Sequence, residues 1–300
     1  MKILLSGASG FLGGHVQKEL LTAGHSVTAV SRSPVAGGES VDWSRGALAA
    51  AVAEADAVCH LAGEPVLGRW TKKRRENIIK SRVETTTLLA ELLAEKGSGA
   101  LVQASAVGFY GDRGADEVDE ETGTGSDFLA GVCRAWEEAA EPARAAGIRV
   151  AAVRIGVILG ANGGALKHML LPFKLGLGGR LGSGRQFFPW VHVGDLARLF
   201  RFLLESKDAS GVFNGTAPEP VSNRDFTREL GHALGRPTIL PVPALAMRLL
   251  LGEVSSMFLT GQRAYPKRAL EAGFRFNHPE LGDALGDLLG GGSRKSGNGR

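Results

Sequence analysis

The stretch SGASGFLGG, residues 6 to 14, lies directly after the apolar run KILLS and opens a helical pattern. Gly7, Gly10 and Gly13 have the spacing of a dinucleotide-binding turn. The first glycine permits a tight turn, the second lets backbone amides approach a pyrophosphate, and the third lets helix and strand pack closely. The phosphate charge then faces a helix N-terminus. The strand–turn–helix context favours this interpretation over a glycine-rich turn without a ligand.

Short apolar runs alternate with helical patterns through the first half of the chain. The runs predict strands at 2–6, 25–31, 55–63, 100–106 and 148–156, and the patterns between them predict helices at 11–24, 45–55, 70–95 and 128–147. Alternation of this kind is typical of right-handed crossovers and a parallel sheet with helices on both faces. The sequence therefore predicts an α/β protein with a Rossmann-type doubly wound parallel sheet.

After Gly156 the pattern changes to a glycine-rich segment with phenylalanine and leucine. Further on, Ser222 is a good helix N-cap with Asp225 three residues later. We predict a second, smaller and mostly helical substrate lobe, with a ligand cleft between the lobes. The predicted division assigns 1–159 and about 191–216 to the dinucleotide domain, 160–190 and 217–289 to the second lobe, and 290–300 to a disordered tail.

Composition narrows the classes of partner. The net charge of the 300 residues is only +4, and no aromatic-rich basic patch occurs, so no nucleic-acid partner is expected. The two cysteines and seven histidines show no metal-ligand spacing. The chain enters a strand at once without a signal peptide, which predicts a cytoplasmic location. The longest apolar stretch, 239–259, is broken by two prolines and two charges and predicts packed helix, so no membrane partner is expected.

The end of the second predicted strand indicates which cofactor binds. A cofactor with a free ribose 2′-hydroxyl favours an acidic residue there. Ser31 and Arg32 occupy this place instead. A hydroxyl and a guanidinium suit a 2′-phosphate through charge-assisted hydrogen bonds. We therefore predict NADP rather than NAD; the alternative is an exposed loop arginine.

Several motifs occur in a family-specific order. The segments SGASGFLGG, HLAGEP, ASAVGFYG and WVHVGDLA resemble the extended short-chain dehydrogenase/reductase superfamily. More narrowly, HLAGEPVLGRW, SRVETT, GGALKHMLLPFKLGLGGRLGSGRQFFPWVHVGDLA, NGTAPEPVSN and GQRAYPKRAL resemble its NAD(P)-dependent epimerase family protein branch, of which some members are labelled cell-division inhibitor homologues. The resemblance extends to about residue 289 and includes a small C-terminal domain. It implies a Rossmann fold and bound NADP(H), with an unassigned small-molecule substrate.

The resemblance also implies which residues contact the cofactor. The implied cofactor-binding residues are Gly7, Ser9, Gly10, Phe11, Leu12, Gly13, Ser31, Arg32, Leu61, Ala62, Gly63, Glu64, Arg82, Ile155, Gly156 and Val157. His60, in the predicted strand 55–63, is expected to lie along the cofactor as well. Ser105 matches the superfamily's active-site serine.

Two departures from the superfamily pattern bear on the reaction. The superfamily's tyrosine and lysine, four residues apart, fall on Phe128 and Val132, and a shift by one residue gives Leu129 and Cys133. In addition, Phe188 stands where nucleotide-sugar epimerases carry an arginine that can clamp a diphosphate. A nucleotide-sugar substrate is therefore not expected.

Other side chains are candidates for the missing proton chemistry. Tyr110, five residues after Ser105, either packs the loop or forms the catalytic pair with Ser105, with its pKa lowered by a cation such as Lys80. Glu64 is either a general base or a carboxylate at a helix start.

The glycine-rich segment and the helix after it supply further candidates. Phe188 and Trp190 indicate an apolar or planar ligand surface, with Arg185 and Gln186 beside them in sequence. His192 and Asp195 are expected to fix a loop and a helix start.

Two functions follow from these features. The first is an NADP(H)-binding oxidoreductase or epimerase with an unusual proton donor, which acts on a small molecule. The second is a catalytically weak or inactive NADP(H)-binding regulatory protein, which the Phe128 and Val132 pair favours. The sequence leaves the substrate and the oligomeric state open.

Overall fold

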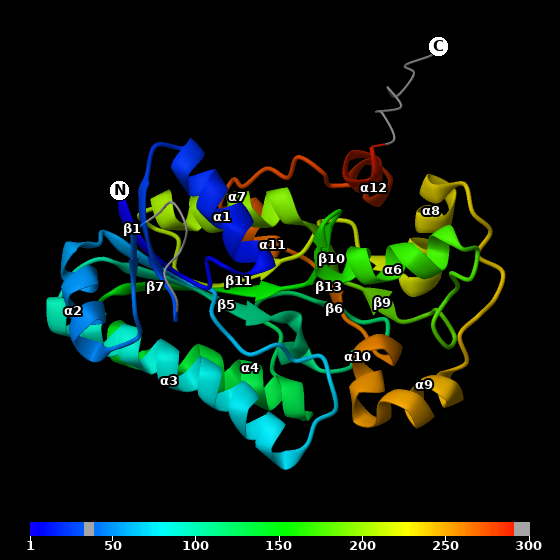
Figure 1. Cartoon of the computed structure of the whole chain (residues 1–300), viewed down its shortest axis with the longest axis horizontal. Coiled ribbons are helices and arrows are strands. Elements are labelled where there is room, and N and C mark those ends of the chain that lie inside the picture. The colour runs from blue at the N-terminus through cyan, green and yellow to red at the C-terminus, as the bar shows by residue number, and fades with distance from the viewer. Residues whose placement is uncertain (33–38, 291–300) are drawn as a thin grey trace, which may run out of the picture.

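The computed structural model describes residues 1–32 and 39–290. At its centre lies a seven-stranded sheet in the order β11-β7-β5-β4-β1-β2-β3, in which every neighbouring pair is parallel (Figure 1). Its strands are β1 (Lys2–Ser6), β2 (Ser26–Val30), β3 (Glu39–Val41), β4 (Ala57–His60), β5 (Ala100–Ala106), β7 (Arg149–Ile155) and β11 (Gly211–Gly215). The predicted doubly wound parallel sheet is confirmed, and the short β3 and the edge strand β11 are added to it.

Helices cover both faces of this sheet (Figure 1). One face carries α1 (Phe11–Thr22), α7 (Val193–Glu205) and α11 (Lys267–Glu271). The other carries α2 (Arg45–Glu54), α3 (Lys72–Lys96), α4 (Phe128–Glu138) and α5 (Glu141–Ala145). Side chains alternate along β1, so that Ile3 and Leu5 enter the first core and Leu4 enters the second.

A second lobe is built on the segments between and after these elements. Its helices are α6 (Gly164–Lys174), α8 (Asn223–Leu234), α9 (Ala244–Leu251), η2 (Gly252–Ser255), α10 (Ser256–Leu259) and α12 (Leu281–Leu289). Short strands pair as β8 (Val157–Gly160) with β10 (Trp190–His192), β9 (Phe187–Phe188) with β12 (Val221–Ser222), and β6 (Glu117–Val118) with β13 (Arg263–Ala264). Leu166, Phe173 and Phe226 share a separate core in this lobe. The 3-10 turn η1 (Val107–Tyr110) follows β5.

Three details differ from the sequence expectations. The helix predicted at 128–147 is divided into α4 and α5, because Pro142 cannot donate a backbone hydrogen bond. Within the range assigned to the second lobe, α11 packs beside β11, and its Ala269 joins the core of the sheet. In the stretch expected to be packed helix, Met247 is the only buried residue of α9.

Of the predicted tail, 290–300, Gly290 is the C-cap of α12, and 291–300 lie outside the described residues. Within 1–32 and 39–290, none of the helices combines the length and apolar character that crossing a bilayer requires.

Candidate functional site

The glycine-rich turn between β1 and α1 depends on close backbone approach. Gly7 has a φ of 77°, in the left-handed region that favours glycine. A Cβ on Gly7 would lie 2.9 Å from the carbonyl carbon of Leu61, and a Cβ on Gly13 would lie 2.0 Å from the oxygen of Gly7. Larger residues at either position would displace the turn. The first and third glycines therefore do what their spacing predicts.

The N-terminus of α1 has the features of an anion site. Gly10 is its N-cap and offers no side-chain hydrogen bond, and the first turn contains no acidic residue. The first-turn N–H groups therefore have no side-chain cap, and a pyrophosphate would accept hydrogen bonds from them. Ser9 and Gly10 are exposed at this end, whereas Leu12 packs against the core.

Phe11 connects this turn to the second lobe. A Cβ at Gly160 would lie 2.3 Å from the Phe11 ring, and a Cβ at Gly163 would lie 2.2 Å from it. The ring therefore packs directly against the glycine turn that leads from β8 into α6. Residues of both lobes meet beside the predicted pyrophosphate site.

The other predicted cofactor residues follow neighbouring strands at their carboxyl ends. Ser31 and Arg32 follow β2, and Arg32 is exposed. Segment 61–64 follows β4, and segment 155–157 joins β7 to β8. Because the carboxyl ends of parallel strands lie at one edge of a sheet, these segments and the glycine turn share that edge, where open α/β sheets bind ligands.

Segment 61–64 is held in place by a side chain of α3. Arg82 donates from Nη1 to the backbone oxygen of Glu64 at 2.9 Å, and its guanidinium lies 4.9 Å from the ring centroid of Trp136. A Cβ on Gly63 would lie 3.1 Å from this guanidinium. Burial lowers the pKa of Arg82. The Glu64 carboxylate instead pairs with Arg74 at 3.6 Å.

His60 is buried rather than exposed along the edge. Its Nδ1 lies 2.5 Å from the Oγ of Ser6, and its Nε2 lies 3.1 Å from the Oγ1 of Thr85. Burial lowers its pKa to about 3, with the charge of Arg82 acting in the same direction. The expectation that His60 lies along the cofactor is therefore wrong, because its ring is enclosed between β1, β4 and α3.

The position of the missing tyrosine is occupied by an aromatic and cationic cluster. Phe128, the first residue of α4, lies 5.2 Å from Trp70 between ring centroids. The guanidinium of Arg75 lies 4.5 Å from the Phe128 ring and forms an ion pair with Glu253 of the second lobe. Val132, where the lysine is missing, is buried.

Ser105 belongs to a buried polar network. Its hydroxyl donates to Oε1 of Glu137 at 2.7 Å, and the serine is 2% exposed. Arg154 donates to both carboxylate oxygens of Glu137, from Nε at 2.8 Å and from Nη2 at 2.9 Å. Ser105 thus shares its carboxylate with a bidentate ion pair inside the protein. A hydroxyl in this position is not available to polarise a substrate carbonyl.

Tyr110 continues the same network. Its hydroxyl donates to Oδ1 of Asn214 at 2.7 Å and accepts from Nη1 of Arg154 at 3.1 Å. The side chain is fully buried, and burial raises its pKa to about 12 although Arg154 acts against this. The predicted catalytic pair of Ser105 and Tyr110 requires a phenol that reaches the substrate, whereas this hydroxyl is enclosed by Asn214 and Arg154, so the geometry contradicts that assignment. Lys80 does not supply the cation, because it is exposed and pairs with Glu84.

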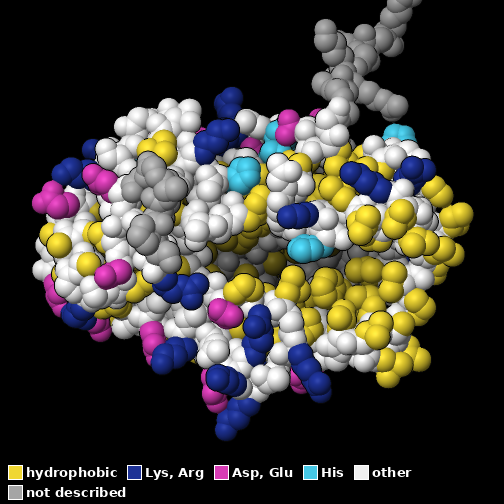
Figure 2. Space-filling model, viewed as in Figure 1, with side chains coloured by type: hydrophobic (Ala, Val, Ile, Leu, Met, Phe, Trp, Pro, Cys, Tyr) yellow, Lys and Arg dark blue, Asp and Glu magenta, His cyan; other side chains and the backbone are white. Residues whose placement is uncertain are grey.

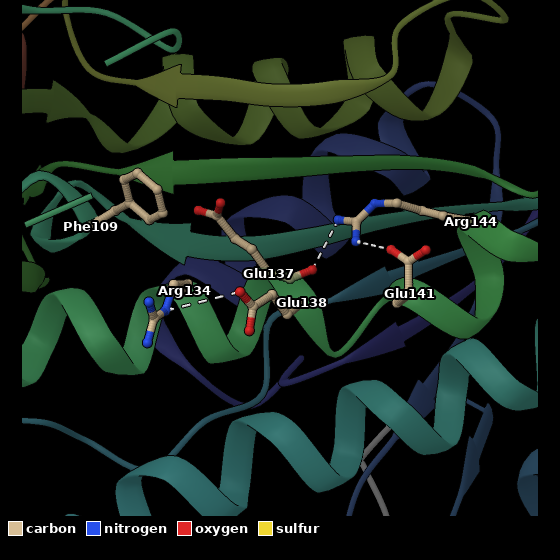
Figure 3. Close-up of a pocket in the computed structure, with 6 residues that line it drawn as sticks. All are labelled: Phe109, Arg134, Glu137, Glu138, Glu141 and Arg144. Atoms are coloured by element: carbon tan, nitrogen blue, oxygen red, sulfur yellow. Dashed lines mark hydrogen bonds and ion pairs between the residues drawn. The ribbon is translucent and has the colours of Figure 1, made fainter. Parts of the chain in front are cut away.

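Figure 3 shows α4 with Glu137, the residue of this helix that belongs to the network. The carboxylate of Glu137 points toward Phe109 and the sheet, whereas Glu138 faces Arg134 on the outer side of the helix. Arg144 donates to the backbone oxygen of Glu137 at 2.9 Å. These groups line a hollow of about 430 Å³ that contains none of the predicted cofactor residues.

The second-lobe candidates have mostly structural roles. Phe188 packs on Phe226 with ring centroids 4.2 Å apart, and Trp190 is 1% exposed and donates to the oxygen of Glu219. The expectation of a ligand surface is therefore wrong for Trp190, because the lobe's own core encloses it. Gln186 donates to two backbone oxygens, whereas Arg185 is exposed.

His192 and Asp195 fix a loop and a helix start, as predicted. His192 caps α7 by accepting from the N–H of Gly194, and Asp195 accepts from the N–H groups of Asn277 and His278. His192, His278 and Asp287 also bring ligand-type atoms within 4.8 Å of one another. Because Nδ1 of His192 accepts a hydrogen bond, its Nε2 carries the proton and donates to Asp287. This favours a hydrogen-bonded cluster over a metal site.

Sequence reasoning missed the residues that surround the predicted pair. Arg154 and Glu137 gave no signal, because a charged residue inside a predicted strand or helix pattern does not reveal its partner. Arg75 lies in the charge run TKKRRENIIKSRVETT, and a run of this kind is typical of a solvated helix face. A spacing of 3.6 residues places Arg75 and Arg82 on one side of α3, and this was the available signal.

Comparisons with known proteins agree with this architecture. A model of the NAD dependent epimerase/dehydratase family matches residues 3–214, and a model of a domain of unknown function, DUF1731, matches residues 242–288. The mouse epimerase family protein SDR39U1 is 41% identical over 297 residues, which cover 96% of this chain and 100% of the mouse protein.

Two solved structures are similar over almost the whole chain. The human epimerase family protein SDR39U1 with NADPH has a TM-score of 0.87 at 37% identity, covering 97% of this chain and 99% of that one. A nucleoside-diphosphate sugar epimerase from Corynebacterium glutamicum has a TM-score of 0.81 at 34% identity, covering 97% of this chain and 58% of that one. With its Rossmann sheet, glycine turn and C-terminal DUF1731 region, the chain belongs to the NAD-dependent epimerase/dehydratase family, in its SDR39U1-type branch.

Proposed function

We propose that the protein is an NADP(H)-dependent oxidoreductase or epimerase that acts on a small molecule without the usual tyrosine and lysine pair. The observation that carries this proposal is the turn at Gly7–Gly13. At Gly7 and Gly13 its backbone leaves no room for a side chain, and α1 has no side-chain cap, so its first-turn amides fit a pyrophosphate. The similar human protein whose structure contains NADPH supports the choice of cofactor.

When bound, the nicotinamide would supply or accept a hydride, and this chain's residues would supply position and charge. Phe128 has no proton to give, and the phenol of Tyr110 is enclosed. The Arg75 guanidinium beside Phe128 can stabilise negative charge on a substrate but does not release its proton. The proton would therefore be exchanged with water or supplied by the substrate.

Cofactor preference tests the proposal directly. A charge-assisted contact from Arg32 to a 2′-phosphate contributes about 1.5–3 kcal/mol, so NADPH should bind roughly tenfold to a hundredfold more tightly than NADH. Titration of cofactor fluorescence with the wild type and Arg32→Ala measures this, with Arg69→Ala as a control outside the predicted cofactor residues. Equal affinity of the wild type for the two cofactors would contradict the preference.

A catalytically weak, regulatory NADP(H)-binding protein is the second candidate. The enclosed Tyr110 and the apolar Phe128 and Val132 favour it, because no phenol with a lowered pKa is found near α4 among the described residues. Screening a panel of carbonyl compounds for NADPH consumption separates the two functions. Turnover supports the enzyme, whereas tight NADPH binding without turnover supports regulation.

Nucleotide-diphosphate sugars are not the proposed substrate. Phe188 replaces the clamping arginine and packs on Phe226. Calorimetry with a panel of such sugars should show no micromolar complex. If one of them binds, Arg185, which is exposed in the same segment, is the group to replace by alanine.

A further inference from the structure

The end of the second lobe exposes an unusual amount of apolar surface. The exposed residues, which we call the leucine surface, are Leu171, Leu175, Leu177, Ile239, Leu240, Leu245, Leu249, Leu250 and Leu251. Leu249 and Leu250 of α9 are 78% and 84% exposed. Outside this set, the described residues expose only four large hydrophobic side chains, and these are scattered over the dinucleotide domain. Gathered apolar side chains of this kind mark an interaction site.

The two parts of the leucine surface are joined by backbone contacts. The N–H of Val242 donates to the oxygen of Arg180 at 2.9 Å, and the N–H of Gly182 donates to the oxygen of Val242 at 2.9 Å. A Cβ on Gly179 would lie 1.6 Å from the oxygen of Leu240. The segment after α6 therefore lies directly beside the segment before α9. Figure 2 shows hydrophobic side chains gathered over this end of the molecule.

The charged residues in the two segments that carry the leucine surface are of one sign, and Glu253, in η2 directly after α9, is paired with Arg75. Segments 160–194 and 230–252, which contain all nine apolar residues, have no aspartate or glutamate. Their cationic residues are Lys167, Lys174, Arg180, Arg185, Arg236 and Arg248. The whole chain has a net charge of only +4, so the remainder of the sequence is net acidic. Positive charge is thus concentrated in the two segments that carry the exposed leucines.

This charge distinguishes between possible occupants. In a twofold dimer formed through the leucine surface, Lys174 and Arg248 of one copy would approach the same cationic surface of the other. An anionic bilayer instead offers acyl chains to the leucines and phosphate groups to the cations. We propose that the leucine surface binds the face of a membrane that contains anionic lipids, with α9 lying in the headgroup region.

This inference is independent of the cofactor, because the leucine surface shares no residue with the glycine turn. It replaces the expectation, drawn from the sequence, that the apolar stretch is packed and that no membrane takes part. The protein lies on the bilayer and does not cross it, so the absence of a spanning helix among the described residues is compatible with it.

Vesicle sedimentation with the full chain tests the proposal. Vesicles of phosphatidylcholine with phosphatidylglycerol should bind the protein at least about tenfold more tightly than phosphatidylcholine alone, and added salt should weaken binding. The double variant Lys174→Glu and Arg248→Glu should lose at least about thirtyfold, since each cation contributes about a factor of five. Leu249→Ser with Leu250→Ser should lose about tenfold or more.

Matched controls are Lys207→Glu and Leu21→Ser, which change exposed residues on the dinucleotide domain. They should bind vesicles like the wild type. All variants should keep the NADPH affinity and the thermal unfolding temperature of the wild type, which shows that they are folded. Absence of binding to anionic vesicles, or equal loss in the controls, would overturn the proposal. So would a stable dimer in sedimentation velocity that the leucine variants convert to monomer while vesicle binding stays absent.

Discussion

The glycine turn at the start of α1 and the first residues of α4 both correspond to motifs of the superfamily. They differ in how much of those motifs they retain. The turn keeps the glycine backbone of the pattern, where a Cβ on Gly13 would lie 2.0 Å from the oxygen of Gly7. At α4 the side chains have changed, and Phe128 and Val132 replace the reacting groups. Backbone features of the superfamily pattern are thus present in this chain, whereas the side chains of its reacting pair are not.

The largest effect is expected at the α4 network. Glu137→Gln leaves the Arg154 guanidinium, which is 4% exposed, without a carboxylate. Breaking a buried ion pair by removing one partner costs about 3–5 kcal/mol. The free energy of unfolding in urea should fall by this amount.

Glu138→Gln is the control for Glu137→Gln, since Glu138 is 70% exposed and lies one residue further along the helix. It should change stability by no more than about 0.5 kcal/mol. If both variants lose the same amount, the buried network is not what stabilises this region.

The next effect is expected at the glycine turn. In Gly13→Ala, the new Cβ would lie 2.0 Å from the Gly7 oxygen, so the turn must shift. We expect NADPH affinity to fall about a hundredfold and stability to fall by about 1–3 kcal/mol. Gly14→Ala is the control, because a Cβ there meets its nearest atom at 3.9 Å. An unchanged affinity in Gly13→Ala would refute the predicted pyrophosphate site.

Tyr110→Phe should affect stability rather than chemistry. Removing the hydroxyl leaves Asn214 and one Arg154 donor without a partner, which costs about 1–3 kcal/mol. NADPH affinity, and the rate with any substrate found, should stay within about threefold, because the hydroxyl is enclosed by Asn214 and Arg154. A hundredfold loss of turnover at unchanged stability would restore the original assignment of Tyr110 as general acid.

The pH dependence of Tyr110 gives a second measurement. Its pKa is raised to about 12 in the folded protein, whereas an unfolded tyrosine titrates near 10. The stabilisation is therefore complete below pH 10 and is lost as the pH rises from about 10 to about 12. Urea unfolding in this range should show a weaker loss in Tyr110→Phe than in the wild type.

The smallest effect is expected for Phe128→Tyr. The Phe128 ring is only partly buried between Trp70 and Arg75, so a hydroxyl can be added with a change of no more than about 0.5 kcal/mol. Val132→Lys, by contrast, buries a charge and should destabilise far more. If thermal unfolding shows that Val132→Lys is tolerated equally well, α4 could still accept the ordinary pair.

The sequence by itself determined the parts of this protein that follow from local patterns. The glycine spacing predicted a turn whose third glycine packs on the first, and the alternating apolar runs predicted the parallel sheet, because both depend on residues adjacent along the chain. Resemblance of SGASGFLGG, ASAVGFYG and the long central motif indicated the family, which the comparisons show. The absence of a tyrosine at Phe128 was likewise visible in the letters alone.

Tertiary structure decided where the remaining polar and apolar side chains lie. Ser105 matches the superfamily's active-site serine and Tyr110 follows it by five residues, but Glu137 and Arg154, on α4 and β7, enclose them in a buried network. The leucines of α9 resemble a packed helix in sequence, yet the lobe leaves them exposed. Both outcomes depend on residues distant in sequence, because the burial of a side chain is set by which elements pack over it and not by its neighbours along the chain.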